Sequence, residues 1–174
     1  MPALHRDFVL GECDTRDMTW RAVAVAAVII TIVVYAVGSG ALVSTGSTWY
    51  LALDKPAWQP PPWIFGLIWP YNFVAIGVVG SVIAWNAVPA RVIAVLVLLA
   101  VTVAFALTWA YLFYGPHQLT GAAIALTATA VLTLPIVVIA FAERWWLGVL
   151  LVPYQVWVAL AASLSWGYVA KVGA

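Results

Sequence analysis

The residues in this sequence that are best suited to chemistry are aromatic, and they gather between positions 49 and 69. This stretch, WYLALDKPAWQPPPWIFGLIW, contains four prolines and four tryptophans, Trp49, Trp58, Trp63 and Trp69. Flat aromatic rings hold a planar apolar ligand by stacking and by burying its surface. Three consecutive prolines fix φ and remove backbone donors, so we expect a stiff loop that leads into a helix near the last of them. The stretch therefore predicts a lid or wall over a binding site.

Other kinds of chemistry have few residues to support them. His5 and His117 are isolated, without a cysteine or carboxylate at ligand spacing, so we expect no metal site. His117 could reach a haem-like ligand from its turn, or it could simply be a solvated turn histidine. No nucleophile lies beside a base, and a net charge of +1 gives no basic face for nucleic acid. We therefore expect a binding site made of rings, with no required cofactor.

The elements that must position these rings are membrane helices. The chain has 174 residues, of which 66% are hydrophobic and only 7% charged, far outside the range of a soluble domain. Apolar runs of about 20 residues can cross the hydrocarbon core as helices. We expect an all-α integral membrane protein, a bundle of five transmembrane helices in a domain over 20–174, behind a polar N-terminal tail over 1–19. The predicted spans are 20–43, 61–88, 91–112, 119–141 and 146–169.

The basic residues predict the orientation of this bundle. With five spans, Arg21, Arg91 and Arg144 lie on the side of the N-terminus, and Lys55 and Lys171 lie on the other side. Basic residues near span ends favour the cytoplasm, so we expect a cytoplasmic N-terminus and an external tryptophan-rich loop. The spans themselves hold no clear ionisable residue, which disfavours an ion pathway or a proton-coupled pump.

Two further patterns concern helix faces. Ala100, Ala104 and Thr108 recur every four residues, and such a stripe of small residues lets two helices approach closely, either between two copies of the chain or within one. Several of the eleven tryptophans lie near span ends, as in interfacial belts. Trp69, Trp109 and Trp157 lie deeper or on paired faces and are harder to explain in that way. A pocket that they line would suit porphyrins or sterols by size.

Three motifs carry a resemblance to a known family. WY followed by K-P-x-W-x-P-P-x-W, with a further tryptophan at Trp69, resembles the first-loop signature of the TspO/MBR family, the tryptophan-rich sensory proteins and translocator proteins. The block LLVPYQVWVALAASLSW, from Leu150 to Trp166, resembles the last helix of that family. WAYLFYG, from Trp109 to Gly115, is similar to its W-x-P-x-F-F-G motif, with Tyr111 at the usual proline.

The resemblance implies a function as well as a TspO-like fold. Family members bind porphyrins, and some bind sterols, in a cavity formed by five helices and closed by the first loop. We therefore expect a homodimer in a bacterial cell membrane that binds protoporphyrin or haem, with a regulatory or stress-linked role, and that contacts the membrane lipids. The implied ligand-binding residues are Trp49, Tyr50, Pro60, Pro61, Trp63, Trp69, Phe73, Trp109, Tyr154, Trp157 and Ala161. The implied dimer interface is the stripe of Ala100, Ala104 and Thr108.

The resemblance also leaves alternatives open. Trp69 and Trp157 match tryptophans implicated in light-dependent breakdown of protoporphyrin by bacterial members, in which they would be the catalytic residues, although a stacking role is equally compatible. A carrier of porphyrin or of a sterol-like lipid is a third reading. Family asparagines fall at Ala106 and Ser165 here, and each substitution removes an amide that could bond a ligand or a neighbouring helix.

Overall fold

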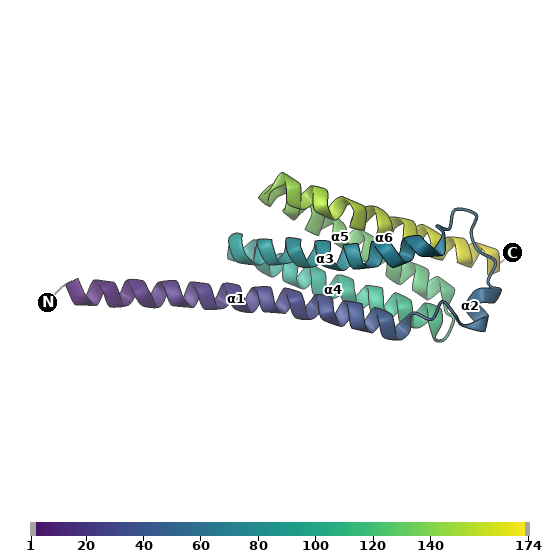
Figure 1. Ribbon diagram of the computed structural model, residues 1–174, viewed down its shortest axis with the longest axis horizontal. Coiled ribbons are helices and arrows are strands. Elements are labelled where there is room, and N and C mark those ends of the chain that lie inside the picture. The colour runs from purple at the N-terminus through teal and green to yellow at the C-terminus, as the bar shows by residue number, and fades with distance from the viewer. Residues whose placement is uncertain (1–2, 173–174) are drawn as a thin grey trace.

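Helices are the only regular secondary structure in the described part of the chain. A computed structural model describes the backbone of residues 3–172 and the side chains of residues 17–172. A loop joins the long helix α1 to the five-residue helix α2, and short turns connect the four helices that follow (Figure 1). The helices are α1 (Ala3–Leu42), α2 (Thr48–Ala52), α3 (Pro62–Asn86), α4 (Pro89–Tyr114), α5 (Leu119–Glu143) and α6 (Trp145–Val172).

Five of these helices are long and apolar enough to cross a membrane, which confirms the predicted fold class. The predicted ends differ from the observed ones by a few residues. Helices α3 and α4 begin at Pro62 and Pro89, because proline fits the first turn of a helix, where its missing N–H is not needed. The candidate spans are Asp17–Leu42, Pro62–Asn86, Pro89–Tyr114, Leu119–Glu143 and Trp145–Val172.

Helix α1 is longer than the predicted first span, because its backbone is helical from Ala3. Much of the segment predicted as a polar tail thus belongs to the same continuous helix, which projects beyond the other helices at the N-terminal end (Figure 1). Where the apolar part begins, Arg21 pairs with Asp17 at 3.0 Å and also donates to the carbonyl of Trp85. The ion pair lies within α1, and the hydrogen bond to Trp85 joins α1 to the end of α3.

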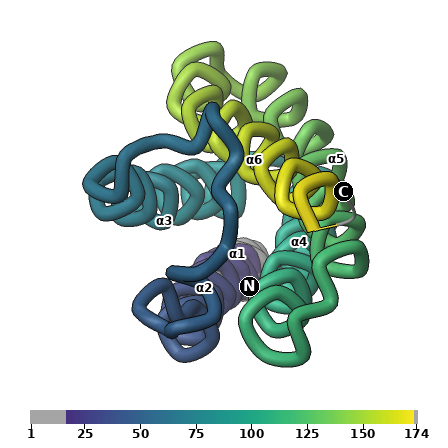
Figure 2. The backbone as a smooth tube through the Cα atoms, turned by 90° about the vertical axis from the view of Figure 1, so that its right-hand side faces the viewer, coloured from purple at the N-terminus to yellow at the C-terminus, as the bar shows by residue number. Residues whose placement is uncertain are grey.

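The long helices are arranged in a ring. Helix α1 packs against α3 and α4, α3 packs against α6, and α5 fills the outside between α4 and α6. Figure 2, viewed along the bundle, shows the chain between α2 and α3 crossing the ring of helices at the end where α6 terminates. The N-terminal end of the bundle and the end with the crossing loop are therefore opposite each other (Figure 1).

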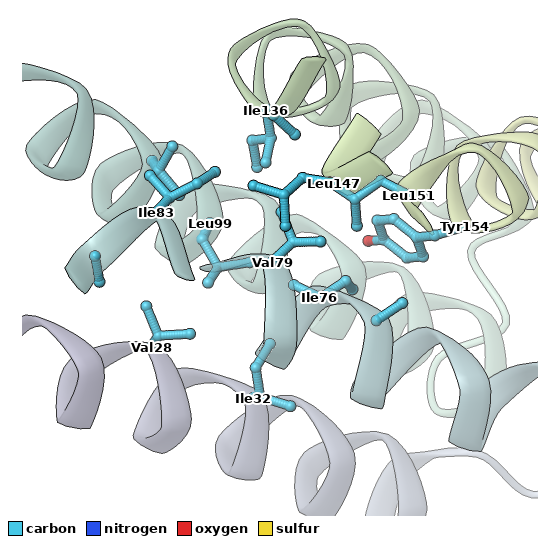
Figure 3. Packing of buried hydrophobic residues seen from close by; sticks show 14 of the residues in the cluster. Val28, Ile32, Ile76, Val79, Ile83, Leu99, Ile136, Leu147, Leu151 and Tyr154 are labelled. Carbon is cyan, nitrogen blue, oxygen red and sulfur yellow. The ribbon is translucent and has the colours of Figure 1, made fainter. Parts of the chain in front are cut away.

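The hydrophobic core fills the bundle at the end opposite the crossing loop (Figure 3). Val28 of α1 meets Val79 and Ile83 of α3, while Leu147 and Leu151 of α6 close the other side, and all five are at most 2% exposed. Burying an aliphatic side chain is worth about 1.5–3 kcal/mol relative to leaving it exposed to water. In a membrane the alternative surrounding is also apolar, so close packing supplies much of the specificity here.

The small-residue stripe on α4 faces outward. Ala100, Ala104 and Thr108 are all exposed, and the Thr108 hydroxyl donates to the Ala104 carbonyl of its own helix at 2.8 Å. Close packing within the monomer, one of the two readings of the stripe, is therefore wrong. The stripe remains available to lipid or to a second copy of the chain.

Candidate functional site

A cavity of about 730 Å³ lies at the loop end of the bundle. Its walls come from α1, α3, α4 and α6, and its roof comes from α2 and the chain that follows it. This volume falls within the range of about 300–1,000 Å³ that is common for small-molecule and cofactor sites. Most of the side chains that line it are aromatic or aliphatic.

The α3 wall is built from aromatic residues spaced four apart. Phe65, Trp69 and Phe73 line the cavity because residues four apart share one face of a helix. The Trp69 and Phe73 rings stack with centroids 5.8 Å apart, and Tyr35 of α1 meets both rings edge-on at 6.1 and 5.2 Å. Pro70 lies within this helix and cannot donate to the carbonyl of Gly66, which also lines the cavity. This wall thus offers flat rings, and the Gly66 carbonyl lacks the backbone donor that it would have in a regular helix.

The opposite wall joins α4 to α6 through a hydrogen bond. The Trp109 indole donates from Nε1 to the Ser165 hydroxyl at 3.0 Å, so Ser165 still supplies an acceptor where the family has an asparagine. Ala106, at the other departure, is buried and lines the cavity without a polar group. Trp157 of α6 meets Phe65 edge-on at 5.1 Å, and its buried Nε1 has no hydrogen-bond partner. A ligand acceptor could satisfy this donor.

The roof begins with the short helix α2. The Ser47 side chain caps this helix by accepting from the Tyr50 backbone N–H at 3.2 Å. Tyr50 lines the cavity, whereas its neighbour Trp49 stacks on His117 with centroids 3.8 Å apart. Consecutive residues of a helix point about 100° apart, so the two rings cannot share a face. His117, in the turn after α4, has a positive φ of 59° and serves here as a platform for Trp49.

The roof continues through residues 53–61, which we call the strap. The Asp54 carboxylate binds the Lys171 ammonium of α6 at 2.5 Å, and the Tyr168 hydroxyl donates to the side-chain oxygen of Gln59. A Cβ on Gly167 would lie 2.7 Å from Pro56, so glycine lets the strap rest directly on α6. Three contacts therefore hold the strap down along the last turns of α6.

The predicted ligand-binding residues divide into two groups. Six of them line the cavity: Tyr50, Trp69, Phe73, Trp109, Trp157 and Ala161. The other five do not. Trp63 is 65% exposed on the outer face of α3, Tyr154 is buried in the core beside the cavity, and Trp49 stacks on His117. Pro60 and Pro61 shape the strap and the start of α3.

Several residues that line the cavity were not singled out from the sequence. Phe65 could have been found, because it precedes Trp69 and Phe73 by the same interval of four. Lys55 of the strap belongs to the first-loop motif but was considered only for orientation, and Tyr35 of α1 and Tyr168 of α6 carry no comparable local signal. Their positions depend on how the helices assemble, which spacing along one helix does not reveal.

These features define a class of protein: a membrane bundle of five spanning helices that enclose an aromatic cavity under a proline-rich strap. The profile of the TspO/MBR family matches residues 22–170, which includes all the elements that build the cavity. The chain belongs to the TspO/MBR family, as the sequence motifs predict.

Several relatives support this membership. The chain is 29% identical over 128 residues to Protein CrtK of Rhodobacter capsulatus, covering 73% of this chain and 79% of that protein. It is 30% identical over 133 residues to the Translocator protein of Homo sapiens, covering 75% and 78%. It is also 30% identical over 138 residues to the Tryptophan-rich sensory protein of Cereibacter sphaeroides, covering 72% and 81%. The chain is thus an integral, multi-pass membrane protein.

Proposed function

We propose that this protein binds a tetrapyrrole, protoporphyrin or haem, in the cavity beneath the strap and serves a regulatory or stress-linked role. The observation that carries the proposal is the aromatic wall: Trp69 and Phe73 on one side and Trp109 and Trp157 on the other flank a space of about 730 Å³. Ring surfaces of this kind favour a large flat apolar ligand through stacking and area burial. The name of the Cereibacter relative, a sensory protein, agrees with a regulatory role.

A cavity-filling variant tests binding directly. Ala161 lines the cavity, whereas Ala159, on the same helix, is exposed on the outer face. Protoporphyrin titrated in the dark into purified protein in neutral detergent should give a saturable shift of the porphyrin absorbance band. We expect Ala161→Phe to weaken binding more than tenfold and Ala159→Phe to leave it unchanged. Equal binding by both variants, or no saturable shift in the wild type, would refute the proposal.

A second candidate function is light-dependent breakdown of protoporphyrin. It is favoured by the placement of Trp69 and Trp157 on the wall of one cavity, together with the unpaired Trp157 Nε1. Illumination of the bound complex in the presence of dioxygen distinguishes it from binding alone. Loss of the porphyrin band that slows in Trp69→Phe and Trp157→Phe, while dark binding persists, would establish this activity. A stable band under light would leave the binding and regulatory function.

Carriage of a porphyrin or a sterol-like lipid is the third function to test, and the names of the translocator relatives agree with it. Vesicles that contain the protein and a porphyrin gradient should show protein-dependent flux if the chain is a carrier. Flux equal to that of protein-free vesicles would remove this function without affecting the proposed binding.

The assembly and orientation belong to the same proposal. The exposed stripe at Ala104 is flanked by the exposed apolar residues Val101 and Phe105, a face on which a second copy could pack. We expect Ala104→Trp to convert a dimer in detergent into a monomer, as measured by light scattering.

We also expect Cys13, the single cysteine, to be shielded from an impermeant maleimide in intact bacterial cells, because the N-terminus is cytoplasmic.

A further inference from the structure

The cavity is apolar, yet its mouth carries a positive charge. Lys55 of the strap is the one charged side chain among the described residues that line the cavity. Its ammonium nitrogen lies 5.4 Å from the centre of the Tyr50 ring, which also lines the cavity. A lysine ammonium is a compact, hydrated point charge on a flexible stem, so it can reach an anionic group at the mouth.

The carboxylates of the described chain are engaged elsewhere. Asp54, next to Lys55 in the sequence, binds Lys171 at 2.5 Å. Asp17 and Glu143 pair with arginines at the opposite end of the bundle. Lys55 takes part in none of the three salt bridges found in residues 17–172. The loop end thus presents a cation that no carboxylate of the described residues neutralises.

The apolar cavity and its charged mouth suit different parts of a ligand. Below the mouth, Trp69, Phe73 and Trp157 supply ring surfaces that suit an apolar body. At the mouth, a neutral ligand that covers Lys55 would strip water from its ammonium without supplying a partner, which is unfavourable. A carboxylate at the same place would replace that water with an opposite charge.

We propose that Lys55 is a specificity-determining residue that selects flat apolar ligands bearing a carboxylate at one edge over neutral ligands of the same shape. This inference rests on the proposed function and deepens it. It places the acidic edge of the ligand at the strap and the apolar body toward α3 and α6. It also predicts that an acidic tetrapyrrole is preferred to a neutral sterol-like lipid.

A pair of matched ligands provides the test. Protoporphyrin and its dimethyl ester share the ring and differ in the two carboxylates, so each is titrated in the dark into the full chain in neutral detergent. The proteins are the wild type, Lys55→Met, Lys55→Arg and Arg144→Met. Arg144→Met removes one positive charge at the far end of the bundle and controls for net charge.

The quantity to compare is the ratio of the two dissociation constants in each protein. Partition of the free porphyrins into detergent affects that ratio equally in all four proteins, so it cancels when the ratios are compared. Because Lys55 remains partly solvated, we expect a preference of about threefold to tenfold for the acid in the wild type. We expect the preference to persist in Lys55→Arg and Arg144→Met and to vanish in Lys55→Met.

The outcomes separate this inference from the proposed function. Binding of both porphyrins with the same ratio in the wild type and in Lys55→Met would overturn the role of Lys55 and leave the binding function intact. Failure of both porphyrins to bind the wild type would overturn the proposed function, and the inference with it. Raising the ionic strength should shrink the preference in the wild type, because salt screens an exposed charge pair.

Discussion

The two ends of the bundle differ in how closely their helices approach. At the far end from the strap, a Cβ built on Gly80 of α3 would lie 2.8 Å from a Val28 methyl of α1, closer than normal packing permits. At the strap end, Gly40 of α1 and Gly66 of α3 line the cavity, and a Cβ on either would meet nothing within 4 Å. The same two helices thus touch at one end and part at the other. The packed end holds the fold together, and the open end is free to bind.

The largest effect should follow from filling the contact between α1 and α3. Leucine at Gly80 must displace Val28, which is fully buried and stiff at χ1, so Gly80→Leu should lower stability by about 1–3 kcal/mol. Gly66→Leu makes the same change in open space and should not lower stability, although it should weaken porphyrin binding by occupying the cavity. Thermal unfolding in detergent measures the stability of both variants. Equal losses of stability would contradict the division between the two ends.

A smaller effect is expected where the strap rests on α6. The added methyl group of Gly167→Ala would lie 2.7 Å from Pro56 and 2.9 Å from Trp58, so the strap must lift. We expect a loss of about 1 kcal/mol, the lower part of the usual overpacking range. Limited proteolysis within residues 53–61 should become faster. Gly77→Ala, on α3 with nothing within 4 Å, is the matched control and should keep the strap protected.

The hydrogen bond across the cavity wall should contribute a similar amount. Ser165→Ala leaves the Trp109 indole N–H without its acceptor, which should cost about 0.5–1.5 kcal/mol of stability. The exposed Ser163 bonds only the Leu160 carbonyl of its own helix, so Ser163→Ala should be neutral. Unfolding measurements on the two variants check the difference. If Ser163→Ala proved as costly as Ser165→Ala, the cross-wall bond would have no special role.

The smallest effect on global stability should come from the ion pair of the strap. The side chains of Lys171 and Asp54 are 35% and 76% exposed, so Asp54→Asn should change stability by less than about 1 kcal/mol. The strap itself should exchange its amide hydrogens faster, because one of its three attachments is gone. Hydrogen exchange of residues 53–59 provides the readout, and unchanged exchange would show that the pair does not restrain the strap.

The spanning helices could be predicted closely because their signal is local. Long apolar runs, with Pro62 and Pro89 at two of the starts, define them without knowledge of their neighbours. The N-terminal end of α1 was placed differently, because polar composition predicted a separate tail while the backbone continues as one helix. Composition reports where a helix can enter a membrane, and it does not report where that helix begins.

The site could be predicted only in part, because tryptophan is also favoured at membrane surfaces. Trp69 and Trp63 both lie near the start of α3, yet the first lines the cavity and the second is 65% exposed. Residues four positions apart share one face of a helix, so this spacing from Trp69 excludes Trp63 and also identifies Phe65. No such rule identifies Tyr35, whose partners lie on another helix. Contacts between helices supply the information that is missing from each span.

The placement of the tryptophans also has an optical consequence. Trp69, Trp109 and Trp157 line the cavity, whereas Trp85, Trp145 and Trp146 lie at the opposite end of the bundle. Energy transfer from an indole to a porphyrin falls steeply with distance, so the two groups would lose emission to different degrees when a porphyrin enters. The emission lifetimes should then separate into a short and a long population. Emission from the native tryptophans therefore reports how deep a bound ligand lies, without any added label.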